Sequence, residues 1–211
     1  MSKTLRQIDK DVYTDVGTYV CCGLNVTTHD GNDAKCVIGK YCSVSLNLKL
    51  ILGANHRSDW ISTFPFKDFP EFCTNKKTLE VKGHPTTKGD IIIGNDVWIG
   101  KNVTILSGVT IGDGCVIGCE TVVTKSCPPY TIVVGNPGRC VKDRFPKEII
   151  DKLLKIKWWN LPLSKINDIS HVLTSSDFDA FFSLFSDILV PNKEIPLERF
   201  GIDKILDGTI R

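Results

Sequence analysis

Two histidines fall in one aromatic and polar stretch, residues 53–90, whose side chains could support acid–base chemistry. His56 is the stronger candidate, because a neutral imidazole, with an ordinary pKa of about 6.5, can take a proton from a hydroxyl or an amine near neutral pH. Asp59 could fix the tautomer of that ring, or it could pair with Arg57 and hold the loop, and we favour the second role. His84, within Gly-His-Pro, could contact a substrate, although a structural role is favoured. Because a lone histidine is more often structural than catalytic, the surrounding elements must decide.

The element that positions the rest of the chain is residues 93–128, which repeat with a period of six. Every repeat opens on Ile or Val and carries a small or β-branched residue four places later, while four repeats have Gly at the second position. Neither a helix nor a plain strand repeats every six residues, whereas a parallel β-helix does, with one short strand and one turn per repeat. We therefore predict that the first and fifth positions fill a narrow core, and that the glycines serve an unusual φ or a close backbone approach. Six repeats in phase argue against a chance run in a β-sandwich.

The same period is faint from Val20, sharpens at Ile38, breaks after about residue 52 and resumes near Ile91. Residues 53–90 therefore form a long loop inserted into the coil, and such loops often carry function. The aromatic residues of the loop would be costly to leave in water, so they must pack on their own prism or on a neighbouring subunit. They include Trp60, Phe64, Phe66, Phe69 and Phe72, of which Trp60 is expected to bind substrate or support the loop.

Beyond Val123 the period decays, and a last strand near Cys140–Val141 is expected to end the prism. The apolar spacing after Pro146 is typical of an amphipathic helix, and further helices are expected after Pro162 and from Asp177 to Ile188. These helices would cover an open end of the coil, whose exposed strand would otherwise invite aggregation.

The predicted organisation is thus mainly β in two parts. A β-helix spans residues 1–144, with the loop at 53–90, and a helical cap and tail span residues 145–211. The final segment, 190–211, carries no motif from which a function can be inferred.

Composition narrows the functional classes. A net charge of +2 provides no bulk basic surface for nucleic acid, and no stretch approaches the ~20 apolar residues of a membrane span. The N-terminus lacks the apolar run of a signal peptide, so a cytoplasmic location with reduced thiols is expected for the nine cysteines. No cysteine pair has zinc-ligand spacing, and no metal is expected. Four cysteines fall at fifth positions and should fill the core: Cys36, Cys42, Cys115 and Cys127.

The loop and its flanking repeats resemble one family closely. Gly53-Ala-Asn-His-Arg-Ser-Asp-Trp-Ile-Ser-Thr-Phe-Pro-Phe66 is similar to the signature loop of the hexapeptide-repeat xenobiotic acetyltransferases, which include chloramphenicol and streptogramin acetyltransferases and related sugar acetyltransferases. The likeness continues through Gly89–Gly100, Val134–Pro137 and Lys157–Trp159. Ala54 stands where the family's loop usually has a second Gly.

The resemblance implies a left-handed parallel β-helix that assembles as a homotrimer, with active sites between adjacent subunits. One subunit's loop would supply His56 as general base, and acetyl-CoA would lie along the neighbouring prism face. Trp98, at a sixth position expected at or outside a turn, would wall the channel or pack on the neighbour's loop. The residues expected to contact acetyl-CoA are Gly100, Gly118, Asn136, Pro137, Arg139, Lys142 and Arg144. A backbone N–H near Gly100 or Ser107 would stabilise the oxyanion.

The activity implied is direct transfer of an acetyl group to an amine or hydroxyl of a small acceptor. An amino sugar, perhaps nucleotide-linked, is favoured, and a hydroxylated antibiotic is the alternative. A metalloenzyme of the carbonic anhydrase type is disfavoured because the repeats at 93–128 contain no histidine. A non-catalytic trimeric scaffold is disfavoured because the loop around His56 is intact.

Overall fold

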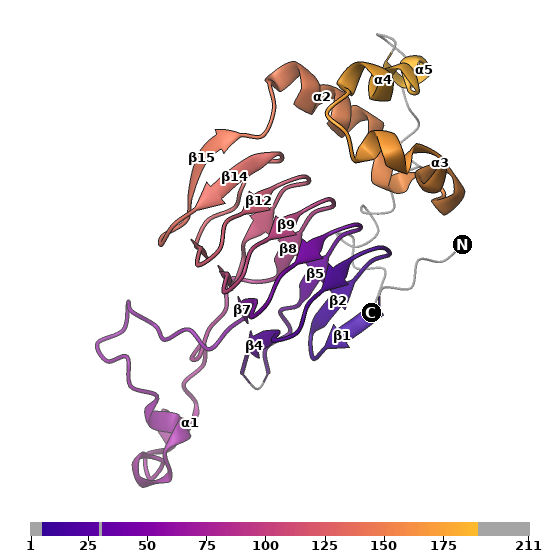
Figure 1. Cartoon of the computed structure of the whole chain (residues 1–211). Coiled ribbons are helices and arrows are strands. Elements are labelled where there is room, and N and C mark those ends of the chain that lie inside the picture. Colours follow the sequence, from indigo (N-terminus) through magenta and orange to yellow (C-terminus); the bar gives the residue numbers. More distant parts are fainter. Residues whose placement is uncertain (1–5, 30, 190–211) are drawn as a thin grey trace. The chain divides into compact units, whose positions relative to one another are not determined.

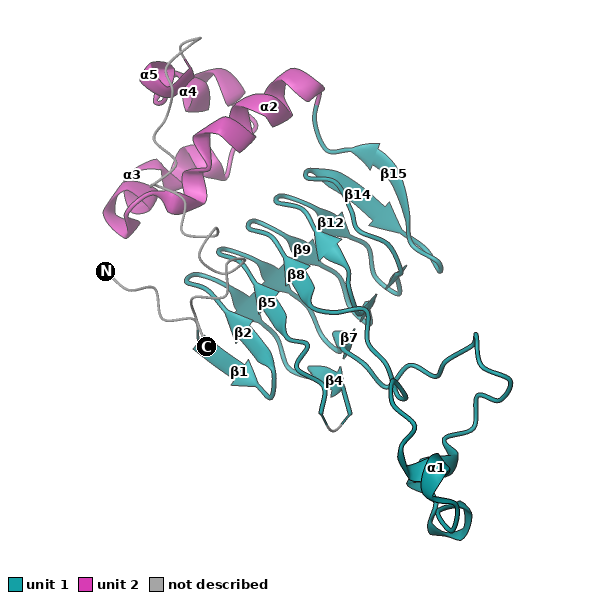
Figure 2. Cartoon of the chain, turned by 180° about the vertical axis from the view of Figure 1, so that it is seen from behind, with its two compact units in different colours: residues 1–145 teal, residues 146–211 magenta. Residues whose placement is uncertain are grey.

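The computed structural model describes residues 6–29 and 31–189, so the first five residues and the segment 190–211, for which no function was inferred, lie outside the described residues. The chain divides into two compact units, residues 1–145 and 146–211 (Figure 2). Within the described ranges, no helix combines the length and the apolar character that crossing a membrane requires.

Three sheets form the first unit, and the chain visits them in turn as it coils (Figure 1). The five-stranded sheet has the order β1 (Arg6–Asp9), β2 (Val12–Thr14), β5 (Cys36–Ile38), β8 (Ile91–Ile93) and β11 (Thr110–Ile111). The four-stranded sheet has the order β13 (Val122–Val123), β10 (Thr104–Leu106), β7 (Lys49–Ile51) and β4 (Asn25–Thr27). The six-stranded sheet has the order β15 (Arg139–Asp143), β14 (Thr131–Val134), β12 (Val116–Ile117), β9 (Trp98–Ile99), β6 (Ser43–Val44) and β3 (Tyr19–Val20).

The pairing confirms a three-sided parallel β-helix. Strands on successive coils pair in parallel with partners such as Thr104 and Val122, 18 residues or three repeats apart. At the two ends, β1 and β15 turn back and pair antiparallel with β2 and β14. The coil begins earlier than the faint period at Val20 indicated, because Val12 in β2 already pairs with Cys36.

The core is confirmed at the first and fifth positions of each repeat. Side chains at the first positions of residues 93–128 are at most 1% exposed, and those at the fifth positions at most 7%. The four cysteines predicted to lie inside are buried as well. Each fully buried Ile or Val contributes about 1.5–3 kcal/mol relative to an exposed one, so a stack of such side chains holds successive coils together.

The second-position glycines serve a close backbone approach, and the unusual φ lies elsewhere. A Cβ on Gly100 would come within 2.7 Å of the backbone nitrogen of Cys119 on the next coil. Positive φ values recur instead at the fourth position, for example at Asp96 and Asn102. The sixth position lies in the strand rather than at a turn, so Trp98 is the first residue of β9 and its side chain points outward.

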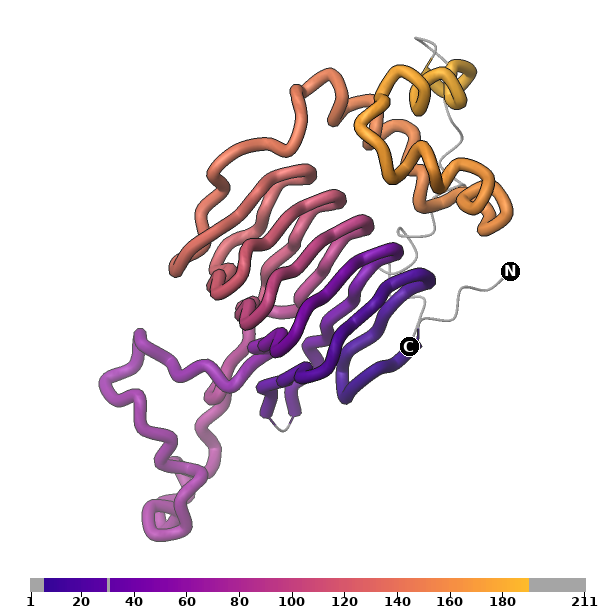
Figure 3. Tube along the Cα trace, viewed as in Figure 1, coloured from indigo at the N-terminus to yellow at the C-terminus, as the bar shows by residue number. Residues whose placement is uncertain are grey.

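The predicted loop leaves the prism after β7 and returns to it at β8 (Figure 3). Register partners across this gap, such as Cys36 and Ile91, are 55 rather than 18 residues apart, which makes the insertion 37 residues long. An isolated bridge between Asn55 and Thr86 closes its neck. The loop contains three short helical turns, η1 (Phe66–Asp68), η2 (Pro70–Phe72) and α1 (Lys76–Leu79).

The second unit consists of short helices: α2 (Lys147–Ile156), η3 (Trp158–Asn160), α3 (Leu163–Leu173), α4 (Phe178–Ser183) and α5 (Ser186–Leu189). Leu153 and Ile156 are buried on one face of α2, as the amphipathic pattern predicted. The single helix predicted over Asp177–Ile188 is instead two helices, because the N–H groups of Leu184 and Phe185 donate to carbonyls three residues back and tighten the chain there.

Candidate active site

The ring of His56 is held in one tautomer by the loop itself. Its Nδ1 lies 2.6 Å from the carbonyl oxygen of Thr63. A carbonyl oxygen can only accept, so Nδ1 carries the proton and Nε2 keeps its lone pair. The His56 side chain is exposed. The tautomer is thus fixed by a backbone carbonyl and not by Asp59.

Asp59 pairs with its near neighbour, which is the role favoured from the sequence. The Nε of Arg57 donates to Asp59 Oδ1 at 2.7 Å, and Nη2 contacts Oδ2. This guanidinium lowers the pKa of Asp59 to about 2, so the carboxylate stays charged. Arg57 also lies 5.4 Å from the centre of the half-buried Trp60 ring, which ties these three side chains together at the start of the loop.

His84 returns from the far end of the loop to meet His56. The centres of the two rings are 4.7 Å apart and their planes are perpendicular, at 89°. The ring of Trp60 lies on another side of His84, at 5.7 Å. The structure therefore brings together His56, Trp60 and His84, which are up to 28 residues apart in the sequence. The neck at Asn55 and Thr86 makes this meeting possible, and the Nδ2 of Asn55 donates to Ser107 Oγ at 3.3 Å.

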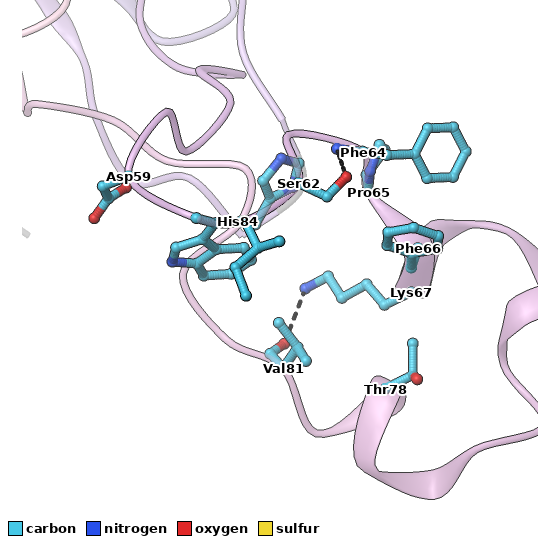
Figure 4. Close-up of a pocket in the computed structure, with 11 residues that line it drawn as sticks. Asp59, Ser62, Phe64, Pro65, Phe66, Lys67, Thr78, Val81 and His84 are labelled. Atoms are coloured by element: carbon cyan, nitrogen blue, oxygen red, sulfur yellow. Dashed lines mark hydrogen bonds between the residues drawn. The ribbon is translucent and has the colours of Figure 1, made fainter.

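A cavity of about 660 Å³ opens beside the rings of Trp60 and His84 (Figure 4), and His56 is not among its lining residues. Its walls are mostly aromatic and aliphatic, with a few polar groups among them. The lining residues are Asp59, Trp60, Ile61, Ser62, Phe64, Pro65, Phe66, Lys67, Thr78, Val81 and His84. Such a volume and lining suit a small, largely apolar organic molecule.

The loop presents an apolar surface at its tip. The four rings of Phe64, Phe66, Phe69 and Phe72 pack on one another, with centres 4.8–5.8 Å apart. Each of these rings nevertheless stays 37–44% exposed, and Ile61 is fully exposed. Exposed apolar patches of this kind often mark interaction surfaces.

Most of the residues expected to bind the cofactor gather on or beside one face of the prism. Trp98 on β9 is 55% exposed. Its register partner on β12 is Val116, which pairs in turn with Ile132 on β14, so the three side chains form an outward-facing apolar row across the sheet. Asn136 and Pro137 are exposed in the turn between β14 and β15, and Arg139 and Lys142 are exposed on β15. All of these belong to the six-stranded sheet or to its turns.

Three other residues on the cofactor list have structural contacts. Arg144 donates from Nη1 to the carbonyl of Gly114 at 2.6 Å, lies 3.6 Å from Asp96, and covers the rings of Tyr130 and Phe145. Gly100 lies against the backbone of the next coil, and a Cβ on Gly118 would meet a methyl group of Val134 at 2.9 Å. For Arg144 and Gly100 these contacts explain the residue type by packing within the coil.

The structure does not bring the two halves of the predicted site together within one chain. The loop leaves from the corner between the four-stranded and five-stranded sheets. The residues expected to bind the cofactor lie on the six-stranded sheet, which is the side of the prism opposite that corner. Among residues 6–29 and 31–189, no group of three or more His, Cys, Asp or Glu side chains is placed to hold a metal ion.

Sequence reasoning missed two contributors to the site. The carbonyl of Thr63 carries no side-chain signal, because any residue at that position would supply the same oxygen. Asn55, which anchors the neck next to His56, was read only as part of the loop motif, although an Asn at the start of an insertion could have been recognised as a group that bonds across a turn.

Comparison with known proteins gives consistent matches. The family model described as bacterial transferase hexapeptide (six repeats) matches residues 90–125. The chain is 47% identical over 142 residues to a "Probable macrolide acetyltransferase" of Lysinibacillus sphaericus, covering 67% of this chain and 78% of that protein. It is 39% identical over 163 residues to a "Chloramphenicol acetyltransferase" of Agrobacterium fabrum, covering 76% of each. It is 44% identical over 146 residues to a "Virginiamycin A acetyltransferase" of Staphylococcus aureus, covering 69% of this chain and 65% of that protein.

Proposed function

The chain belongs to the family of hexapeptide-repeat acetyltransferases and is an acyltransferase, and we propose that it transfers an acetyl group from acetyl-CoA directly to a hydroxyl group of a small, largely apolar acceptor. One observation carries this proposal. His56 has its Nδ1 proton committed to Thr63 and its Nε2 free, beside a ring that lines an apolar cavity. Family membership also supports a left-handed sense for the coil.

The proposed reaction is one direct displacement. The acceptor hydroxyl gives its proton to Nε2 of His56 as its oxygen attacks the thioester carbonyl carbon, which forms a tetrahedral intermediate. The C–S bond then breaks, and the departing thiolate takes the proton back from Nε2, which leaves an acetyl ester and free coenzyme A. The bond from Nδ1–H to Thr63 keeps the ring oriented and stabilises the imidazolium while it holds both protons. No acyl-enzyme is needed.

The cavity favours a hydroxylated antibiotic over an amino sugar. A sugar carries several hydroxyls that need partners when buried, and the polar groups on this wall are few. The relatives named for macrolide, chloramphenicol and virginiamycin A acetylation point the same way. The amino-sugar acceptor that the sequence favoured stays a prediction, to be compared in the same assay.

The position of the loop supports a site shared between chains, and hence the homotrimer expected from the family. The loop that carries His56 leaves from the corner opposite the six-stranded face, so we infer that a second chain supplies one of the two. The apolar tip around Phe64 and Phe69 gives that second chain a surface to cover. The exposed Arg139 and Lys142 fit the phosphates of coenzyme A as charge-assisted donors, and the apolar row at Trp98 fits its pantetheine arm.

Two variants test the base and the shared site together. Thiol release from acetyl-CoA is measured with chloramphenicol, a macrolide, virginiamycin and amino sugars as acceptors. His56→Ala should lower kcat about 10²–10⁴-fold and leave the fold intact, since the ring is exposed and makes a single hydrogen bond to the loop. Trp98→Glu should block the cofactor face of its own prism.

Mixed oligomers give the decisive readout. Co-refolding the two inactive variants should restore activity, because some sites then combine an intact His56 from one chain with an intact β9 face from its neighbour. If a mixture whose exchange has been verified stays inactive, the shared site is wrong. If wild type and His56→Ala release thiol equally with every acceptor, the role of His56 is wrong.

A further inference from the structure

We propose that His84 is an acceptor-binding residue, which hydrogen-bonds a second oxygen of the acceptor while His56 takes the proton from the oxygen that becomes acetylated. This inference rests on the proposed function and adds the kind of acceptor. The acceptor should carry a second oxygen function besides the hydroxyl that is acetylated, on an otherwise apolar skeleton.

The burial of His84 is the first argument. His84 is only 4% exposed, and neither of its ring nitrogens has a hydrogen-bond partner among the described residues. Burying a polar group without a partner is unfavourable, so such groups are rare in native structures and usually have a partner that arrives later. His84 lines the cavity and both of its nitrogens are covered in the unbound protein, so a bound molecule supplies that partner by displacing a side chain that covers the ring.

The second argument is the distance between the two histidines. Their ring centres are 4.7 Å apart, and the perpendicular planes direct their nitrogens along different lines. The carbonyl of Thr63 already occupies Nδ1 of His56, so Nε2 is the nitrogen available to the acceptor. The two rings are close enough for one small molecule that carries two oxygens to bond both of them with hydrogen bonds of about 2.8–3.0 Å.

Three other polar groups of the cavity have partners within the loop. Asp59 is held by Arg57. The hydroxyl of Ser62 accepts from the N–H of Phe64 at 3.1 Å, and the ammonium of Lys67 reaches the carbonyl of Val81 at 3.5 Å, both drawn as dashed lines in Figure 4. Among the polar residues that line the cavity, which also include Thr78, His84 is the one that is buried, so its imidazole is the group best placed to bind a second oxygen.

Kinetics with a matched pair of acceptors test the proposal. The probes are chloramphenicol, which has hydroxyls on two carbons separated by one, and its 1-deoxy analogue. His84→Phe keeps an aromatic ring and removes both nitrogens, so kcat/KM for chloramphenicol should fall about tenfold, with KM for acetyl-CoA unchanged. With the deoxy analogue the loss should be less than about threefold, because the hydrogen bond is already missing. His84→Gln, which keeps an N–H donor, should recover part of the loss.

A stability comparison tests the same idea without any acceptor. His29 is a matched histidine with a structural partner, since its Nδ1 accepts from the N–H of Ala54 at 2.9 Å. His29→Phe should lower the midpoint of thermal unfolding, because a hydrogen bond is lost. His84→Phe should leave the midpoint unchanged or raise it, because an unpaired polar ring is replaced by an apolar one.

The outcomes separate this proposal from the proposed function. An equal loss of kcat/KM with both acceptors, or a fall in the unfolding midpoint as large as that of His29→Phe, would show that His84 only supports the loop. If wild type releases no thiol with any acceptor, the proposed function fails by itself. The stability comparison then decides, and a lowered midpoint for His84→Phe overturns the inference.

Discussion

Replacing Gly100 with Ala offers a direct measure of how tightly successive coils are stacked. A Cβ built at Gly100 would lie 2.7 Å from the backbone nitrogen of Cys119, and 3.0 Å from both Cys119 Cα and the carbonyl carbon of Gly118. The atoms it meets are main chain, so no side chain can rotate out of the way. Gly118→Ala is a matched change at the same position of the next coil, where the added methyl meets a flexible methyl of Val134 at 2.9 Å.

The cost follows from the distance that the coils must separate. Ordinary contact for a Cβ begins at 3.4 Å, so the two coils would have to part by 0.7 Å at Gly100. The bond from the N–H of Gly100 to the carbonyl of Ile117, now 2.8 Å, would lengthen to about 3.5 Å, where it contributes little. Overpacking of this kind costs about 1–3 kcal/mol, and the weakened hydrogen bond adds about 1 kcal/mol. Gly118→Ala should stay within about 0.5 kcal/mol of wild type.

Chemical denaturation of both variants at equal protein concentration measures the difference. We expect Gly100→Ala to lower the free energy of unfolding by about 2–4 kcal/mol, with the maximal rate following the folded fraction and KM for acetyl-CoA unchanged. Equal stability of the two variants would refute the coil-stacking argument. Normal stability of Gly100→Ala with a strongly raised KM for acetyl-CoA would show that this glycine serves the cofactor instead.

Two further predictions concern charged residues near the last coils. Arg144→Gln should lower the free energy of unfolding by about 2 kcal/mol and leave KM for acetyl-CoA within about twofold, because the guanidinium already bonds the carbonyl of Gly114. Arg139→Gln, on the exposed β15, should raise that KM about fivefold with unchanged unfolding, and the opposite pattern for the pair would contradict the assignment. Burial, partly offset by Arg144, raises the pKa of Asp96 from its ordinary 3.8 to about 6, so the native state takes up a proton between pH 7 and pH 5 that the unfolded chain does not. The free energy of unfolding should therefore rise by about 1 kcal/mol as the pH falls from 7 to 5 in wild type but not in Asp96→Asn. Equal pH dependence of unfolding in the two proteins would contradict this prediction.

The parts of the fold that the sequence predicted are those in which burial in the core alone determines the residue type. Side chains at the first and fifth positions fill the core regardless of what binds the outer surface. Ile93 and Val97 therefore indicate both the six-residue period and the face that points inward. The insertion was visible for the same reason, since residues 53–90 interrupt that period. Positive φ at the fourth position was not visible, because residues as different as Tyr41, Asn102 and Glu120 adopt it.

The parts of the site that could not be predicted depend on main-chain atoms, or on which of several possible partners a charged side chain contacts in the folded chain. Thr63 acts through its carbonyl, which no sequence pattern records. In the sequence Arg144 is one of three basic residues between positions 139 and 144, and only the folded coil shows that Gly114 and Asp96 lie within its reach. The pairing of Asp59 with Arg57, by contrast, could be expected from the sequence, because side chains two residues apart in a loop can contact each other whatever the rest of the fold is.

The narrow neck of the insertion has a consequence for how this protein can diverge. Strands on either side of the gap, β7 with β10 and β5 with β8, pair as they would without the 37 intervening residues. A single bridge between Asn55 and Thr86 fastens both ends of the excursion at one corner. Mutations, deletions or recombination in the loop beyond that bridge can therefore change the acceptor specificity while the strand pairing of the coil stays the same. New specificities can arise in this way without lowering the stability of the coil.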